Sequence, residues 1–245
     1  MLKKLIKPAI NSLGIDIVKY PLSPLGRKLR DFLREERINL VVDVGACDGG
    51  FCRMLRSECE YCGPIASIEP CYTSFEAVKR KMAADQKWRG IQVALSDSDG
   101  EGVLHTFEEN SDWNSLHQVK KLSADAYALQ LDKQRSEQII LRKFDTLWDD
   151  ITRGIQSPRV FLKMDTQGHD VNVFKGAKER LPFIIGAQSE LPAIEMYEGM
   201  ISMGDTLKFF SGEGYTPIGF YEVAGPKVFG GAVPEFDVLF KRLTQ

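Results

Sequence analysis

The sequence predicts one doubly wound α/β domain, in which a mostly parallel, seven-stranded sheet carries helices on both faces and a small antiparallel insertion. Two observations support this fold class. Short apolar runs alternate with amphipathic segments along most of the chain, the order expected of parallel strands joined by right-handed crossovers. Of the 245 residues, 43% are hydrophobic and 27% are charged, which is enough apolar material to bury such a sheet on both faces.

Residues 1–25 are predicted to form an N-terminal arm, and residues 26–245 the domain. The arm starts basic and apolar and ends in the turn-rich Tyr20–Pro24. A proline and two polar residues at positions 8–12 interrupt its apolar run, so we expect neither a secretory signal nor a spanning helix, and a cytoplasmic location. We expect its apolar side to pack on the domain. A homo-oligomer contact or peripheral contact with an anionic membrane stays open.

The elements of the domain follow from its hydrophobic periodicity. A first helix is predicted from Arg27 to Arg37, with Leu29, Phe32 and Leu33 facing inward. Continuous apolar runs indicate strands that are buried on both faces. The predicted strands of the main sheet are Ile38–Val44, Ile65–Ile68, Ile91–Leu95, Val160–Met164, Phe183–Ala187, Thr216–Tyr221 and Phe236–Lys241. Further helices are predicted from Phe51 onward, around Val78, and from Asp170 to Leu181, where Pro182 stops the last one.

An antiparallel pair, Gly102–Phe107 and Gln138–Lys143, is predicted to interrupt the parallel series. The segment between them, Ser111–Glu137, is polar and weakly patterned. A stretch of this length in a compact domain is usually a functional lid, or it contains helices that the weak pattern does not reveal. We therefore expect it to shape a substrate pocket, with Trp113 and His117 available to stack on a ring.

Charge and cysteine content narrow the class of protein. The formal net charge of −2 provides no positive field that would attract nucleic acid. The odd number of cysteines, five, is expected to be reduced thiols. Cys59 and Cys62 have the spacing of half a zinc or redox site, but no second pair follows and the three histidines lie far away. We therefore predict no metal site.

The most informative motif is Val41–Gly50, in which an apolar strand leads into a glycine-rich turn and a helix. Such turns lie at the carboxyl ends of strands, where nucleotide-like ligands bind. The turn lacks the G-x-G-x-x-G of a dinucleotide site. Its two acids, Asp43 and Asp48, would repel a pyrophosphate and suit a cationic sulfonium with an α-amino group. Glu69, at the end of the second strand, is placed to accept hydrogen bonds from ribose hydroxyls.

Two segments carry a resemblance to a known family. Val41–Phe51 resembles the cofactor motif of class I methyltransferases. Phe161–Gly176 is similar to the signature of FkbM-type methyltransferases, a Lys-hydrophobic-Asp-x-x-Gly run followed by a helix ending in Leu-Lys-Gly. The resemblance covers residues 40–240, and Asn114 and Ser115 match a further family segment. The chain departs from the family pattern at Cys47 and at His169 and Asp170.

The resemblance implies a Rossmann-like class I methyltransferase domain whose last strand is antiparallel. It also implies S-adenosyl-L-methionine as cofactor and O-methylation of a hydroxyl on a sugar, a glycan or another small metabolite. The expected partner is this small-molecule or glycan acceptor, and not nucleic acid. The predicted cofactor-binding residues are Asp43, Gly45, Ala46, Asp48, Gly49, Phe51, Glu69, Pro70, Ser96, Asn114 and Ser115.

Three residues near the ends of the fourth and fifth strands are predicted to be catalytic: Asp165, His169 and Glu190. A hydroxyl is a poor nucleophile while protonated, so a base or a metal should assist the transfer. Asp165 is placed just past a strand, and each of the three also has a plain structural interpretation as a cap or a surface residue. A divalent cation held by Asp165 and Glu190 is an alternative, but it is not predicted.

Three other functions stay open. A nicotinamide-dependent oxidoreductase is disfavoured by the missing dinucleotide motif. A non-catalytic subunit that binds an S-adenosyl ligand or a nucleotide is disfavoured by the intact acids of the site. A nucleic-acid base methyltransferase often has an Asn/Asp-Pro-Pro-aromatic motif where this chain has Asp165–Gly168.

Overall fold

The chain is described here by a computed structural model covering residues 23–107, 110–223 and 229–243. The central strand β1 (Leu40–Val44) is buried along its whole length. Leu40 and Val42 belong to one hydrophobic core and Val41 to another, because successive side chains of a strand point to opposite faces. The continuous apolar run therefore supplies both faces of the sheet, as predicted.

The main sheet has seven strands in the order β3-β2-β1-β7-β8-β10-β9. The first five in this order are parallel, and β10 is antiparallel to both of its neighbours. This confirms the predicted doubly wound sheet and the antiparallel last strand. Besides β1, the strands are β2 (Ile65–Ile68), β3 (Trp88–Ile91), β7 (Val160–Met164), β8 (Ile184–Pro192), β9 (Tyr215–Glu222) and β10 (Glu235–Arg242).

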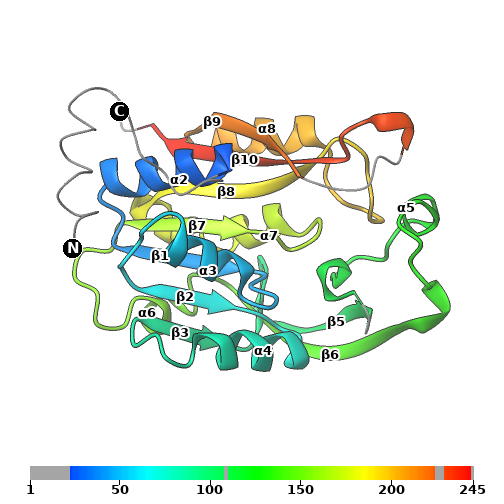
Figure 1. Ribbon diagram of the computed structural model, residues 1–245, viewed down its shortest axis with the longest axis horizontal. Coiled ribbons are helices and arrows are strands. Elements are labelled where there is room, and N and C mark those ends of the chain that lie inside the picture. Colours follow the sequence, from blue (N-terminus) through cyan, green and yellow to red (C-terminus); the bar gives the residue numbers. More distant parts are fainter. Residues whose placement is uncertain (1–22, 108–109, 224–228, 244–245) are drawn as a thin grey trace, which may run out of the picture.

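Helices cover both faces of this sheet (Figure 1). On one face pack α2 (Pro24–Glu35), α3 (Gly50–Ser57) and α4 (Tyr72–Met82). On the other pack α6 (Trp148–Ile151), α7 (Asp170–Lys175) and α8 (Met203–Gly212). Helix α2 buries Leu29, Phe32 and Leu33, as its periodicity predicted. Among the described helices, none combines the length and apolar character needed to cross a membrane.

The insertion forms a second sheet of three strands in the order β4-β6-β5, beyond the carboxyl ends of the main strands (Figure 1). Strands β5 and β6 pair antiparallel, as predicted. The insertion consists of β4 (Ala94–Leu95), β5 (Gly100–Phe107), η1 (Ser111–Trp113), α5 (Lys121–Ala126), η2 (Leu131–Lys133) and β6 (Gln134–Arg142). Side chains of the insertion and of the segment after β8 pack into one hydrophobic cluster, called here the insertion cluster: Phe107, Trp113, Val119, Ala124, Met196, Tyr197 and Met200.

Trp113 does not have the role expected for it. Its ring centroid lies 4.6 Å from that of Tyr127 and 5.9 Å from that of Tyr197, and it is buried in the insertion cluster. An indole packed in this way is not available to stack on an acceptor, so this prediction was wrong.

Several predicted boundaries also differ. The predicted strand Ile91–Leu95 is divided, because Ile91 pairs with β2 whereas Ala94 and Leu95 pair with β6. The predicted helix Asp170–Leu181 ends at Lys175 and is followed by the 3₁₀ helix η3 (Lys178–Phe183). At Gly176 the chain packs against the main chain of Ser96 so closely that a Cβ would lie 2.1 Å from that carbonyl oxygen.

The N-terminal part of the chain bears on two more predictions, the arm and the start of the first helix. Most of the predicted arm, residues 1–22, lies outside the described residues, and α2 begins at Pro24 rather than near Arg27. A last 3₁₀ helix, η4, spans Phe229–Gly231.

Strand β8 continues through Glu190 to Pro192, so Glu190 lies within the fifth strand of the parallel series rather than after it.

Candidate active site

A cavity of about 280 Å³ opens where β1, β2, β7 and β8 reach their carboxyl ends. Gly45, Glu69, Asp165 and Glu190 line it from the main sheet, and Ser115 lines it from the insertion. Open α/β sheets bind ligands at this edge. The volume is near the lower end of the range of about 300–1,000 Å³ that is typical of small-molecule sites.

The glycine-rich turn brings β1 against the loop that follows β7. Gly45 has a φ of +72°, and a Cβ there would lie 1.9 Å from the carbonyl oxygen of Asp165. Only glycine allows this approach, because every other residue carries a Cβ and avoids this backbone conformation. The first glycine of the motif therefore joins the predicted cofactor loop to the predicted catalytic loop.

Glu69 is held by the main chain at the end of β2. One carboxylate oxygen accepts a hydrogen bond from the Cys47 amide at 2.8 Å, and the other accepts one from the Cys71 amide at 3.0 Å. Burial raises the pKa of Glu69 to about 7, although the two amides oppose this shift. Each carboxylate oxygen has further acceptor capacity, so Glu69 can also accept hydrogen bonds from a ligand in the cavity.

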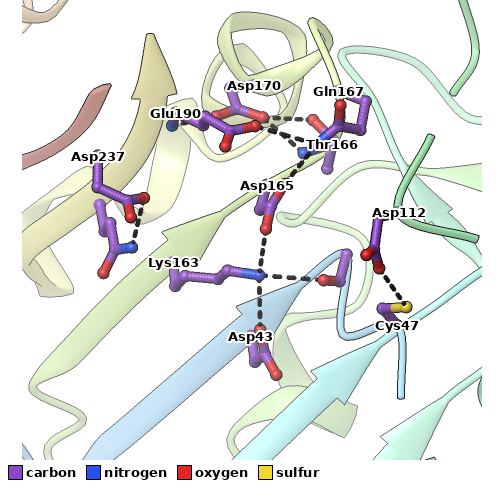
Figure 2. A network of polar contacts seen from close by, with 12 residues as sticks. Asp43, Cys47, Asp112, Lys163, Asp165, Thr166, Gln167, Asp170, Glu190 and Asp237 are labelled. Carbon is purple, nitrogen blue, oxygen red and sulfur yellow. Dashed lines mark hydrogen bonds and ion pairs between the residues drawn. The ribbon is translucent and has the colours of Figure 1, made fainter. Parts of the chain in front are cut away.

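Lys163 connects the ends of β1 and β7, because it bonds to residues at both (Figure 2). Its Nζ lies 3.2 Å from an oxygen of Asp43 and 3.3 Å from one of Asp165, and it donates to the carbonyl of Gly45 at 3.0 Å. Burial opposes the charged form of Lys163, but the carboxylates of Asp165 and Asp43 outweigh it and raise the pKa of the ammonium. Lys163 thus supplies a positive charge to Asp165.

Asp43 does not line the cavity. Its side chain is fully buried, and burial raises its pKa against the opposing effect of Lys163. A direct contact between Asp43 and a cofactor was predicted, whereas the structure gives it the role of holding Lys163. Neither Asp43 nor Lys163 is part of the cavity surface.

Asp165 and Glu190 are bridged by the side chain of Gln167 (Figure 2). The amide nitrogen of Gln167 donates to an oxygen of Asp165 at 2.9 Å and to one of Glu190 at 3.0 Å. Its amide oxygen accepts a hydrogen bond from the hydroxyl of Tyr197 at 2.7 Å. The two predicted catalytic carboxyl groups therefore do meet, through a residue that was not predicted.

Glu190 belongs to a group of buried and half-buried acids on one face of the sheet. Burial raises its pKa well above the usual range, and the charges of Asp165, Glu235 and Asp237 add to the shift. Burial likewise raises the pKa of Glu235 to about 8 and that of Asp237 to about 6. These surroundings favour the protonated form of Glu190, whereas Asp165 lies beside the ammonium of Lys163.

His169 is neutral and both of its ring nitrogens are engaged. Its Nε2 lies 3.0 Å from the hydroxyl of Ser96, and its Nδ1 lies 3.1 Å from Nε2 of His117. Burial, followed by the charge of His117, lowers the pKa of His169 to about 4. His169 lines the cavity, but in this arrangement neither nitrogen is free to act as a base.

The predicted site residues divide into two sets. Those that line the cavity are Gly45, Glu69, Pro70, Asn114, Ser115, Asp165, His169 and Glu190. Those that do not are Asp43, Ala46, Asp48, Gly49, Phe51 and Ser96.

Most of the second set have identifiable structural roles. Asp48 pairs with Lys81 and Arg53 at the surface, with 48% of its side chain exposed. Gly49 precedes α3, with its Cα close to Val78. The ring of Phe51 packs below Lys163, with 5.4 Å between Nζ and the ring centroid.

Sequence reasoning missed further cavity residues, including Cys47, Ser111, Asp112, Thr166 and Gln167. Cys47 and Thr166 directly adjoin predicted residues, Gln167 lies midway between Asp165 and His169, and Ser111 and Asp112 lie at the start of the predicted lid. Among the described residues, no group of three or more histidine, cysteine or acidic side chains is arranged to hold a metal ion.

Solved structures with a similar arrangement of elements are methyltransferases or related proteins. An rRNA methylase from Streptococcus thermophilus is 10% identical, with a TM-score of 0.47 over 92% of this chain and 100% of the other. Magnesium protoporphyrin IX methyltransferase from Synechocystis PCC 6803, with S-adenosylmethionine bound, is 8% identical, with a TM-score of 0.47 over 98% and 97%. Aeropyrum pernix fibrillarin, also with S-adenosyl-L-methionine, is 6% identical, with a TM-score of 0.46 over 82% and 66%.

At the level of sequence, no curated protein matches the chain. The model of the methyltransferase FkbM domain, in contrast, matches residues 43–217. The match runs from β1 into β9 and includes every residue that lines the cavity from the carboxyl ends of the main strands β2, β7 and β8. The chain therefore belongs to the FkbM methyltransferase family.

Proposed function

We propose that this protein transfers a methyl group from S-adenosylmethionine to a hydroxyl oxygen of a sugar, a glycan or another small metabolite. The observation that carries the proposal is the pairing of Glu69 and Asp165 in one cavity. Glu69 is a fixed carboxylate that suits ribose hydroxyls, and Asp165 is an acid beside a buried cation. The two stand at the ends of strands on either side of β1.

The residues present fit S-adenosylmethionine. The oxygens of Glu69 are oriented by two main-chain amides, which leaves acceptor capacity for the two ribose hydroxyls. The acids Asp112 and Asp165 also line the cavity and favour a ligand with a positive sulfonium and an ammonium group. Bound S-adenosylmethionine supplies a methyl group on a cationic sulfur that leaves as a neutral thioether.

The carboxylate of Asp165 is proposed to accept the proton of the acceptor hydroxyl as the oxygen bonds to the methyl carbon. Lys163 and Gln167 each engage one oxygen of Asp165, which fixes its direction. The protonated carboxyl of Glu190 can donate a hydrogen bond to a second oxygen of a polyhydroxylated acceptor. Much of the rate gain is then expected from holding the hydroxyl in line with the methyl carbon.

Calorimetry with S-adenosylmethionine and with NAD is the first test. Binding of the former and not of the latter supports the proposal, whereas the reverse result contradicts it. A methyl-transfer screen over glycans and small hydroxylated metabolites, followed by mass spectrometry, then tests the chemistry. Methylation at nitrogen or carbon only would contradict O-methylation while keeping the family assignment.

A further inference from the structure

Gln167 has a backbone conformation that favours glycine. Its φ is +52°, in a region that non-glycine residues rarely occupy and that is often found at functional sites. It is followed by Gly168, whose φ is +92°. The sharp turn directs the side chain of Gln167 back between Asp165 and Glu190.

The orientation of the Gln167 amide is set by Tyr197, in the segment after β8. Tyr197 donates its hydroxyl proton to the amide oxygen, so the NH₂ group faces the two carboxyl groups. The ring of Tyr197 is completely buried in the insertion cluster. Packing in the insertion cluster therefore places the Tyr197 hydroxyl. The hydrogen bond from this hydroxyl to Gln167 in turn orients the amide that bonds to Asp165 and Glu190.

We propose that Gln167 is the positioning residue of the methyl transfer, and that Tyr197, in the segment after β8, fixes it from the insertion cluster. Gln167 sets the spacing and direction of Asp165 and Glu190 toward the acceptor. This inference rests on the proposed function, because it assigns those acids to acceptor chemistry. It also explains why a neutral amide occupies the position. An acid at 167 would add to the negative charge, and an aliphatic side chain would leave both carboxyl groups without their common donor.

A first experiment needs no acceptor. The thermal unfolding midpoints of the wild type, Gln167→Ala, Gln167→Glu and Tyr197→Phe are measured from about pH 5 to about pH 8. The charged groups that face the pair are Lys163 on β7, Asp170 on α7, and Glu235 and Asp237 on β10. N–H donors favour the ionised form of a carboxyl group. The midpoints of both Gln167 variants should therefore fall further below the wild type as the pH rises, most of all for Gln167→Glu.

A midpoint difference that stays constant with pH would show that Gln167 only fills space, and would overturn the proposal. Tyr197→Phe keeps the packed ring and should fold even if a Gln167 variant does not. Its midpoint should show the same trend at smaller amplitude. Tyr215→Phe is the matched control, because the buried Tyr215 hydroxyl bonds, within the part of the chain that the structure describes, to the main-chain carbonyls of Leu181 and Ile184 and to no titratable side chain. Its midpoint difference should not vary with pH.

A second experiment uses the acceptor found in the screen. Gln167→Ala should lower kcat about 10²-fold, the loss typical of a misplaced catalytic group, and leave the KM for S-adenosylmethionine unchanged. Tyr197→Phe should lower kcat about threefold to tenfold. Gln118→Ala, at an exposed glutamine of the insertion whose side-chain amide bonds to His105 among the described residues, should have no effect. An unchanged kcat in both site variants would refute positioning.

The two proposals fail in distinguishable ways. If the wild type does not bind S-adenosylmethionine, the proposed function is wrong whatever the midpoints show. If the wild type binds it and methylates an acceptor, but the Gln167 and Tyr197 variants keep their kcat and show no pH trend, only the positioning role is wrong.

Discussion

In the half of the cavity next to β1 and β2, the polar groups are held by the main chain, whereas in the half next to β7 and β8 the side chains hold one another. Glu69 accepts from two amides of adjacent loops. Asp165 and Glu190 depend instead on Gln167 and, for Asp165, on Lys163. The first half is thus fixed by the fold itself. The second depends on the identity of a few side chains, and it is the half in which acceptor specificity can change.

The largest effect is expected at Asp165, in the half of the cavity next to β7 and β8. Asp165→Asn should lower turnover about 10²–10⁴-fold, the usual contribution of a general base, with little change in S-adenosylmethionine affinity. Steady-state rates and calorimetry measure the two quantities. His169→Ala is the comparison, and it should cost far less because its ring nitrogens are already engaged. A larger loss at His169, with a rate that rises near the ordinary histidine pKa of about 6.5, would reverse these assignments.

The next largest effect is expected at Glu69, in the half of the cavity next to β1 and β2. Glu69→Gln should weaken S-adenosylmethionine binding by about 1.5–3 kcal/mol, because a charged acceptor is lost. The new NH₂ group would also face one of the amides of Cys47 and Cys71, so the unfolding temperature should fall as well. Calorimetry and thermal unfolding measure the two losses. Unchanged affinity would remove Glu69 from the cofactor site and leave only its role in holding the two loops.

A smaller effect comes from the raised pKa of Glu69. Below its pKa of about 7 the protonated form is a poorer acceptor, so S-adenosylmethionine affinity should decrease by up to about tenfold for each unit of pH below 7. The contribution of Glu69 to folding stability changes with pH in the opposite direction. A carboxyl group whose pKa is raised on folding favours the folded state at low pH, and this contribution is lost between the ordinary value of 4.5 and about 7.

Titration calorimetry from about pH 5.5 to about pH 8.5 checks the binding trend, and Glu69→Gln is its control. The variant lacks the titrating group and should show a flatter profile. An equally steep profile in the variant would assign the pH dependence to another residue.

The smallest expected effect concerns a residue that lies outside both halves. Asp48→Ala should leave S-adenosylmethionine affinity unchanged, because Asp48 bonds to Lys81 and Arg53 at the surface, where ion pairs contribute little to stability. A clear loss of affinity in calorimetry would show that the turn rearranges to bring Asp48 to the ligand, and would extend the first half of the cavity.

The difference between a half held by the main chain and a half held by side chains also explains which parts of the site were predictable from sequence. Strands β2 and β7 were predicted with their correct bounds, because short apolar runs bounded by polar turns are typical of buried parallel strands. Gly45 and Glu69 were found because their positions relative to those strands follow a general rule of the fold. Such positions depend on the main chain, and main-chain patterns are local in sequence.

The second half depends on contacts between distant segments. Gln167 and Tyr197 are 30 positions apart, and nothing local marks either as a partner of the other. One signal for Lys163 was present. Asp43 and Lys163 are charged residues within two otherwise apolar strand runs, and the expense of burying an unpaired charge would have suggested that they pair. The end of β8 was misplaced because Gln188 and Ser189, although buried, are polar.

The close approach of Gly45 to the carbonyl of Asp165 has a consequence for protein engineering. The loop after β1 and the loop after β7 are in contact at Gly45, where an added Cβ would collide with the main chain of Asp165, and Lys163 also bonds to both loops. Transplanting one loop from a relative without the other would therefore bring mismatched backbones into collision. A graft intended to change the acceptor should exchange the two loops as a pair, or keep both and vary only the insertion.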